Sequence, residues 1–208
     1  MNERSRLRLA TEDDAAAIIE IYGDVVRDTA ISFEMVVPDL DEIRQRMRRN
    51  TAFAPWLVAE ERGRCLGYAY GCAFRDRAAY GWTAETAIYV ASSTHRRGVA
   101  RALYTALFEG LRWMGFQNLI AGITLPNVAS VSLHESLGFR RVGVFSRVGH
   151  KHGAWHDVGF WERWIGEDTA SLPTVQLSPP RTPAELYADP AWTRTLAAAG
   201  DLITDPTA

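Results

Sequence analysis

The feature that most constrains the fold is a change of hydrophobic period in the middle of the chain. Residues 83–90 (TAETAIYV) have the pattern of a strand, and residues 94–100 (THRRGVA) then lead into a segment with helical spacing. One face of that segment carries the apolar positions Val99, Leu103, Leu107, Gly110 and Met114. Residues 118–124 (NLIAGIT) return to a strand pattern. A strand, a helix and a strand with short links predict a right-handed βαβ crossover with two parallel strands.

The segments around this crossover predict one α/β domain with a mixed, largely antiparallel sheet flanked by helices. Helices are expected after the capping-box-like run TEDD at 11–14, after Pro38, and in NVASVSLHESLGF at 127–139, where Gly138 closes the helix. Further strands are expected at residues 6–11, 56–61, 66–74, 140–149 and 157–165, the last two joined around KHGAWH at 151–156. We place this domain at residues 1–166.

The last forty or so residues have a different amino-acid composition. Residues 167–208 are rich in Pro, Thr, Ala and Asp, and only TRTLAAAG at 193–200 has helical promise. This composition predicts a poorly ordered or peripherally docked tail.

Composition excludes several classes of protein. The chain has 208 residues, of which 47% are hydrophobic and 11% aromatic, as in a folded globule. Its net charge of −2 gives no general footprint for nucleic acid. There is no apolar run of membrane-spanning length and no signal-peptide core, so we expect a soluble, cytoplasmic protein without a membrane partner. Cys65 and Cys72 lie at an odd offset on one extended segment, which favours two reduced thiols over a disulfide.

The turn between the first strand of the crossover and its helix suits an anion. Backbone N–H groups at a helix N-terminus, next to a glycine that permits close approach, form a site for phosphate. Two arginines in the turn offer charge-assisted hydrogen bonds. The candidate residues are His95, Arg96, Arg97, Gly98, Val99 and Ala100. The stretch lacks the ending of a P-loop and the three glycines of a dinucleotide fingerprint, so on its own it leaves an ordinary basic loop open.

A second motif decides between these readings. In PNVASVSLHESLGF, the residues Asn127, Ser130, Leu133, Gly138 and Phe139 follow the pattern Asn-x-x-Ala/Ser-x-x-Leu-Tyr-x-x-x-Gly-Phe. Together with the turn thirty residues upstream, this resembles the acetyl-CoA site of the GNAT acetyltransferases. The resemblance implies that the sheet splays apart around the thioester, that the turn binds the pyrophosphate, and that pantetheine pairs with the strand at Ile88, Tyr89 and Val90. It assigns Asn127 and Ser130 to the coenzyme as well. His95 departs from the pattern, because the superfamily usually has Gln or Arg there.

One branch of the superfamily matches further. AAYGWTAETAIYV, LYTALFEGL, LHESLGF and especially GHKHGAWHDVGFW look like the phosphinothricin N-acetyltransferases, which acetylate amino acids with a phosphinate side chain. The resemblance covers roughly residues 6–165 and implies a homodimer, acetyl-CoA as co-substrate, no metal, and direct transfer without an acyl-enzyme.

Two residues are candidates for catalysis. Acetyl transfer to an amine needs a base to remove the ammonium proton and a donor for the departing thiolate. Glu85, the only acid in WTAETAIYV, is the predicted base, and burial there should raise its pKa. His134 stands where many GNAT enzymes carry a tyrosine acid, and the branch has a histidine assigned to the catalytic site there. Acid and proton-relay roles both remain open for it.

Four residues are candidates for the substrate. Arg75 and Arg77 are two apart in FRDRAAY, so in an extended segment their guanidinium groups face one way and suit an anionic amino acid. By resemblance, Tyr80 and Phe33 also belong to the substrate pocket. Glu34 stands where the herbicide-resistance enzymes carry arginine, which leaves the exact substrate open.

Three other features of the sequence bear on its function. The residues His150, His152 and His156 suggest a metal by type, but they lack a strong fourth ligand, so no metal is predicted. RQRMRR at 44–49 is read as the solvent-facing side of a helix rather than a nucleic-acid site. Other acceptors remain possible: methionine sulfoximine, methionine sulfone or arsinothricin, or a protein N-terminus. A non-catalytic acyl-CoA-binding module should have lost the base, yet Glu85 is present.

Overall fold

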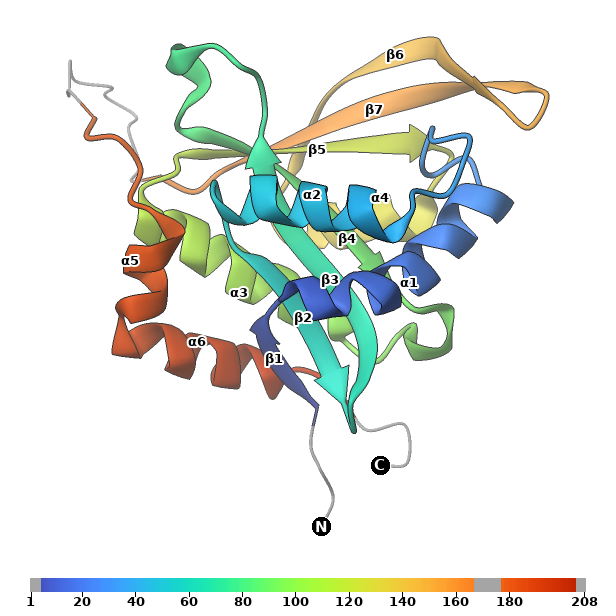
Figure 1. Ribbon diagram of the computed structural model, residues 1–208. Helices are drawn as coiled ribbons and strands as arrows, with labels where there is room; N and C mark the ends of the chain where they lie inside the picture. The colour runs from blue at the N-terminus through green and yellow to red at the C-terminus, as the bar shows by residue number, and fades with distance from the viewer. Residues whose placement is uncertain (1–4, 167–176, 205–208) are drawn as a thin grey trace.

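The computed structural model describes residues 5–166 and 177–204 and is built on a seven-stranded mixed sheet (Figure 1). The strand order is β1-β2-β3-β4-β5-β7-β6, and every described pair is antiparallel except β4–β5. The strands are β1 Arg6–Leu9, β2 Trp56–Glu61, β3 Arg64–Ala73, β4 Thr83–Val90, β5 Asn118–Leu125, β6 Arg140–Lys151 and β7 Ala154–Trp164. The predicted α/β class with a mostly antiparallel sheet is confirmed.

Helices cover both faces of the sheet. On one face, α1 and α2 pack over Val58 and Tyr68, and on the other α3 packs over Leu57 and Ala69. Figure 1 shows α1 and α2 in front of β2 and β3, with α6 beside β1 and α5 beside α3. The helices are α1 Ala15–Asp28, α2 Leu40–Thr51, α3 Val99–Met114, α4 Val128–Ser136, α5 Pro183–Ala188 and α6 Pro190–Gly200.

The predicted crossover is present, with α3 between the parallel strands β4 and β5. The five apolar positions of its predicted face are all buried, and Gly115, at φ 99°, ends the helix. Further residues of α3 that the pattern did not single out are also buried, among them Ala102, Tyr104 and Phe108. A helix buried over most of its circumference must have neighbours on two sides.

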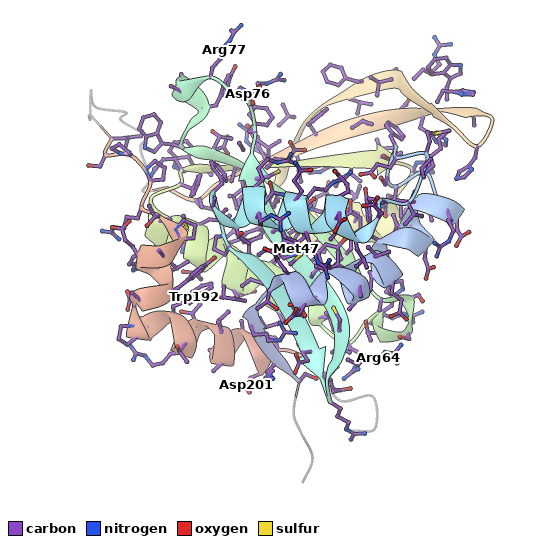
Figure 2. The ribbon with its side chains drawn as sticks, in the orientation of Figure 1. Met47, Arg64, Asp76, Arg77, Trp192 and Asp201 are labelled. Atoms are coloured by element: carbon purple, nitrogen blue, oxygen red, sulfur yellow. The ribbon has the colours of Figure 1, made fainter. Side chains whose placement is uncertain are left out.

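The second neighbour is the C-terminal segment, residues 177–204. Trp192 and Leu186 are buried in the same core as α3, and a Cβ on Gly110 would lie 3.0 Å from the Trp192 ring. Figure 2 shows Trp192 on α6 in this layer. The sequence left open a poorly ordered or a docked tail; the described part is helical and shares the main core. Residues 167–176 lie outside the described residues, and the domain boundary at 166 remains a prediction.

The closing hairpin is longer than predicted. KHGAWH was expected to form the connection, but β6 runs to Lys151 and β7 begins at Ala154. Only His152 and Gly153 turn, with φ of 50° and 74°. Two consecutive positive φ values match the right-handed twist of a two-residue hairpin, which is why the strands extend so far.

Candidate active site

The sheet forks at Glu85. Strands β4 and β5 are paired only where Thr83, Ala84 and Glu85 face residues 118–120. Beyond this point β4 stays with β3 as far as Val90, whereas β5 continues beside β7 as far as Leu125. The facing edges of β4 and β5 therefore diverge. Their main-chain groups need partners other than each other, which an extended ligand can supply.

A cleft of ≈ 1240 Å³ opens beside this fork. Its walls come from α1, β4, the turn before α3, the first residues of α3, and α4. Nearly all of the predicted coenzyme residues line it, namely Ile88, Tyr89, Val90, His95, Arg96, Gly98, Val99, Ala100, Asn127 and Ser130. These residues come from three separate elements, so the fold brings them together.

The turn before α3 has the shape of an anion site. Arg96 and Gly98 are left-handed, with φ of 64° and 79°, and α3 begins at the next residue. Thr94, 3% exposed, anchors the turn through its Oγ1, which donates to the main-chain oxygens of Leu66 at 3.0 Å and Ala91 at 2.8 Å. The first amides of α3 have no acceptor one turn back, and they lie at the positive end of the helix dipole.

Arg97 is the exception among the predicted coenzyme residues. It does not line the cleft. Its guanidinium forms a two-point ion pair with Glu61 at the end of β2, at 2.6 and 3.3 Å, and its Nε donates to the main-chain oxygen of Thr204 at 3.0 Å. The side chain is therefore engaged away from the cleft, so that of the two neighbouring arginines of the turn only Arg96 lines it.

Asn127 shapes the opposite wall as the N-cap of α4. Its side-chain oxygen accepts the N–H of Ser130 at 3.1 Å. This is the standard way in which a helix start satisfies one of its free amides. The Asn-x-x-Ser spacing is thus explained by local structure, while both residues also line the cleft.

Glu85 lies at the apex of the fork. It is the last residue of β4 paired with β5, and Gly122 on β5 leaves room for its carboxyl group. Burial raises the pKa of Glu85, and the positive charge of Arg75 opposes part of that rise. Cys72, the residue opposite Glu85 on β3, has a pKa raised by burial to about 12, so its thiol is a poor nucleophile.

His134 lies in the last turn of α4. It is 3% exposed, with Nε2 at 3.2 Å from the hydroxyl of Tyr104 and Nδ1 at 2.8 Å from the Ser130 carbonyl oxygen. A carbonyl only accepts, so Nδ1 carries the proton and the Tyr104 hydroxyl donates to Nε2. Burial lowers the pKa of His134, which favours this neutral form.

Tyr104, which the sequence reading missed, connects His134 to the fork. Its hydroxyl bonds with the side chain of Thr86, the neighbour of Glu85 on β4. Adjacent strand residues point to opposite faces, so this chain of hydroxyl groups and Glu85 lie on opposite sides of the sheet. The aromatic residue at position 104 on a mainly apolar helix face gave no signal of this role.

The loop between β3 and β4 separates the two predicted arginines. Arg75 lies over the Phe74 ring, at 4.9 Å from its centroid, and is close enough to affect Glu85. Arg77 projects from the outer tip of the loop with Asp76 (Figure 2). Arg77 is the extended N-cap residue of the short helical turn Ala78–Tyr80. Tyr80 is in edge-to-face contact with Phe74, with the ring centroids 5.7 Å apart.

Phe33 lies in the loop between α1 and α2 and reaches across to the hairpin. Its ring covers Gly149 of β6, where any Cβ would overlap it, and its centroid is 6.2 Å from that of His156. Lys151, 2% exposed, fixes this loop by donating to the main-chain oxygens of Val26 and Ser32, each at 2.7 Å.

A family model described as an acetyltransferase (GNAT) domain matches residues 7–159. The chain belongs to the GNAT acetyltransferase family. Phosphinothricin N-acetyltransferase of Streptomyces viridochromogenes is 39% identical over 157 residues, which cover 76% of this chain and 86% of that protein. The L-methionine sulfoximine/L-methionine sulfone acetyltransferase of Salmonella typhimurium is 34% identical over 165 residues, 79% of this chain and 96% of the relative.

Solved structures agree with the sequence comparisons. A GNAT superfamily phosphinothricin acetyltransferase from Sinorhizobium meliloti, solved in complex with AcCoA, matches with a TM-score of 0.79 and 35% identity. The match covers 88% of this chain and 99% of that one. This protein is therefore a GNAT N-acetyltransferase of the phosphinothricin and methionine sulfoximine acetyltransferase group.

The acid at position 34 has charged and polar partners on two helices. Arg46 on α2 pairs with Glu34 at 2.5 Å, and the Tyr22 hydroxyl donates to it at 2.9 Å. The carboxylate is thus neutralised by α1 and α2. The sequence could not reveal these partners, which are twelve residues away on either side.

The remaining expectations concern metals and membranes. The three hairpin histidines have separate partners: His150 the Trp155 ring, His152 the Thr29 oxygen, and His156 the Lys151 oxygen. In the described part of the chain, no three His, Cys, Asp or Glu side chains are grouped as metal ligands. None of its helices combines the length and apolar character needed to cross a membrane.

Proposed function

We propose that this GNAT enzyme transfers the acetyl group of acetyl-CoA to the α-amino group of a small amino acid with an anionic, phosphinate-type side chain. The observation that carries the proposal is the position of Glu85 at the apex of the fork, with a raised pKa and beside Arg75. A half-buried carboxylate where β4 and β5 part, on the strand whose residues 88–90 line the cleft, is a natural acceptor for an ammonium proton.

The residues of the cleft fit acetyl-CoA. The amides that begin α3 and the Arg96 side chain suit a pyrophosphate, and the free edge of β4 at Ile88, Tyr89 and Val90 suits the two amides of a pantetheine arm. When bound, the coenzyme supplies the activated acetyl group as a thioester.

The chain then has two tasks. Glu85 removes a proton from the bound ammonium group, directly or through a water, so that a neutral amine attacks. Arg75, next to Glu85, holds the negative charge of the acceptor while moderating the pKa of the base. His134 is joined through Tyr104 to Thr86 on the side of the sheet opposite Glu85, so a relay through His134 would be separate from the base. The buried, protonated Cys72 favours direct transfer without an acyl-enzyme.

A second acceptor class is supported by a specific observation. One relative carries the name of a methionine sulfoximine and sulfone acetyltransferase, and only one of the two predicted arginines is near Glu85. These acceptors share the zwitterionic end of phosphinothricin but have a different tetrahedral head.

The test is a competition among acceptors. Purified enzyme, acetyl-CoA and an equimolar mixture of phosphinothricin, methionine sulfoximine, methionine sulfone, arsinothricin, glutamate and an alanyl peptide are incubated, and the products are followed by mass spectrometry. The proposal expects phosphinothricin to be acetylated fastest. Faster acetylation of the sulfur compounds would establish the second class, and acetylation of the peptide alone would refute both.

We also propose a cytoplasmic homodimer. The β6–β7 hairpin exposes Val142, Phe145, Val148 and Trp155, each more than half exposed. Large apolar side chains gathered on one surface are typical of a protein interface. Light scattering on the eluted protein tests this assignment.

A further inference from the structure

The C-terminal segment, residues 177–204, contacts α3 at both of its ends. At the C-terminal end, the N–H of Arg181 donates to the Met114 oxygen at 2.7 Å, and its guanidinium donates to the Trp113 oxygen at 3.0 Å. The same guanidinium lies over the Trp113 ring, 4.6 Å from its centroid. These contacts satisfy carbonyl groups that the last turn of a helix leaves free.

At the other end of α3, the segment meets the turn of the coenzyme cleft. The carbonyl oxygen of Arg97 accepts the N–H of Thr204 at 2.9 Å and its hydroxyl at 3.3 Å. In return the Arg97 Nε donates to the Thr204 oxygen at 3.0 Å. The carbonyl oxygen of Leu202 lies directly against Gly98, where a Cβ would overlap it.

Arg97 is consequently held from two sides, by Thr204 and by Glu61 of β2. Its neighbours in sequence, Arg96 and Gly98, are the two left-handed residues of the turn. A non-glycine residue such as Arg96 persists in that region only where the surroundings over-determine it. Arg97, the residue between the two, is held by the ion pair with Glu61 and the hydrogen bonds with Thr204.

We propose that the C-terminal segment is a positioning element for coenzyme binding. It holds the turn at Arg96 and Gly98 so that the amides at the start of α3 converge on the pyrophosphate. Arg97 and Thr204 are the positioning residues, and they act without touching the coenzyme. This inference rests on the proposed coenzyme site. The segment lies beyond residue 159, where the match to the family model ends, so it is a contribution of this chain outside the matched domain.

Comparing how a variant uses two acetyl donors distinguishes a positioning role of the segment from a general structural role. Acetyl-CoA and S-acetylpantetheine carry the same thioester and arm, but only the former has the pyrophosphate. Thr204→Pro removes the N–H that binds Arg97, and Arg97→Met removes the contacts from the other side. In each variant we expect the Kd for acetyl-CoA to rise by about tenfold, the upper end of the scale of one lost hydrogen bond. The kcat/KM with S-acetylpantetheine and the KM for the amino acid should stay within twofold.

The controls use the same chain. Arg194→Met, on the exposed side of α6, should change neither the Kd for acetyl-CoA nor the kcat/KM with S-acetylpantetheine. Arg97→Lys keeps a charge for Glu61 but loses the Nε donor to Thr204, so its Kd for acetyl-CoA should lie between those of the wild type and Arg97→Met. This variant also replaces Arg97→Met in the test if the methionine variant does not fold.

Three results would overturn the inference. Equal loss with both donors would mean a merely structural segment, and an unchanged Kd for acetyl-CoA in both variants would mean no role. If the wild-type enzyme does not prefer acetyl-CoA to S-acetylpantetheine, the turn does not bind the pyrophosphate. The inference, which rests on that site, would then be wrong as well.

Discussion

Replacing Glu85 by glutamine removes the proposed proton acceptor while keeping the shape of the side chain. General-base catalysis contributes about 10²–10⁴-fold, so kcat near neutral pH should fall by that factor, or about 3–5 kcal/mol in the activation barrier. Acetyl-CoA affinity should be nearly unchanged, because the coenzyme residues lie on the turn, the free edge of β4 and α4. The assay is thiol release from acetyl-CoA, with coenzyme binding measured separately by calorimetry.

The pH profile of Glu85→Gln adds a sharper readout. In the wild type, kcat/KM should fall on the acid side with a midpoint above 4.5, the ordinary value for this carboxyl, because burial raises the pKa of Glu85. In the variant this limb should be absent.

The stability effect has the opposite sign to the activity effect. A raised folded-state pKa means that the contribution of Glu85 to the free energy of unfolding is full below the unfolded pKa and is lost as pH rises through the folded one. At pH 7 the variant should therefore resist urea at least as well as the wild type. Glu109→Gln, an exposed residue of α3, is the matched control. Retention of more than half of the turnover by Glu85→Gln, or persistence of the acid limb, would refute the role of Glu85.

Three further predictions follow from the same structure. Tyr104→Phe and His134→Gln should lower kcat by similar factors and the double variant no further, because the two groups share one hydrogen bond of 3.2 Å; additive losses in the cycle would contradict this. Arg75→Met should raise the pKa of Glu85 further, so that the acid limb of kcat/KM moves to higher pH and the KM for an anionic acceptor increases; an unmoved limb would place Arg75 outside the site. Trp192→Ala should lower the free energy of unfolding by about 3–5 kcal/mol in a urea titration, since Trp192 is 5% exposed in the main core; a loss below about 1 kcal/mol would mean that α6 is not part of that core.

The crossover and the coenzyme turn could be predicted because their signals are local. The spacing of Val99, Leu103 and Leu107 fixes the buried face of α3 within one helix, and Gly98 and Gly115 mark its two ends. The Asn127-to-Ser130 spacing is likewise a contact inside one helix start.

The partners of the turn could not be predicted, because they come from distant parts of the chain. Arg97 was grouped with Arg96 as a coenzyme residue, but Glu61 and Thr204 draw its side chain away. Spacing alone does not show which of two neighbouring arginines faces a cleft. The same reason explains Glu34, whose charge is matched by Arg46 on another element.

The C-terminal segment was underestimated for a different reason. Its composition is that of a weakly structured tail, and its buried side chains are few and widely spaced: Pro183, Leu186, Trp192 and Ala199. The better signal was in α3, where Tyr104 and Phe108 lie off the predicted apolar face. A helix with large apolar residues beyond one face requires a second covering layer.

The central claim is that Glu85 and the cleft beside it serve acetyl transfer to a small amino acid. The most direct measurement is thiol release from acetyl-CoA by the purified wild-type chain with phosphinothricin as acceptor. The account predicts saturable release, with one acetyl group appearing on the α-amino nitrogen for each thiol freed. Binding of acetyl-CoA without thiol release for phosphinothricin or any other small amino acid would contradict it.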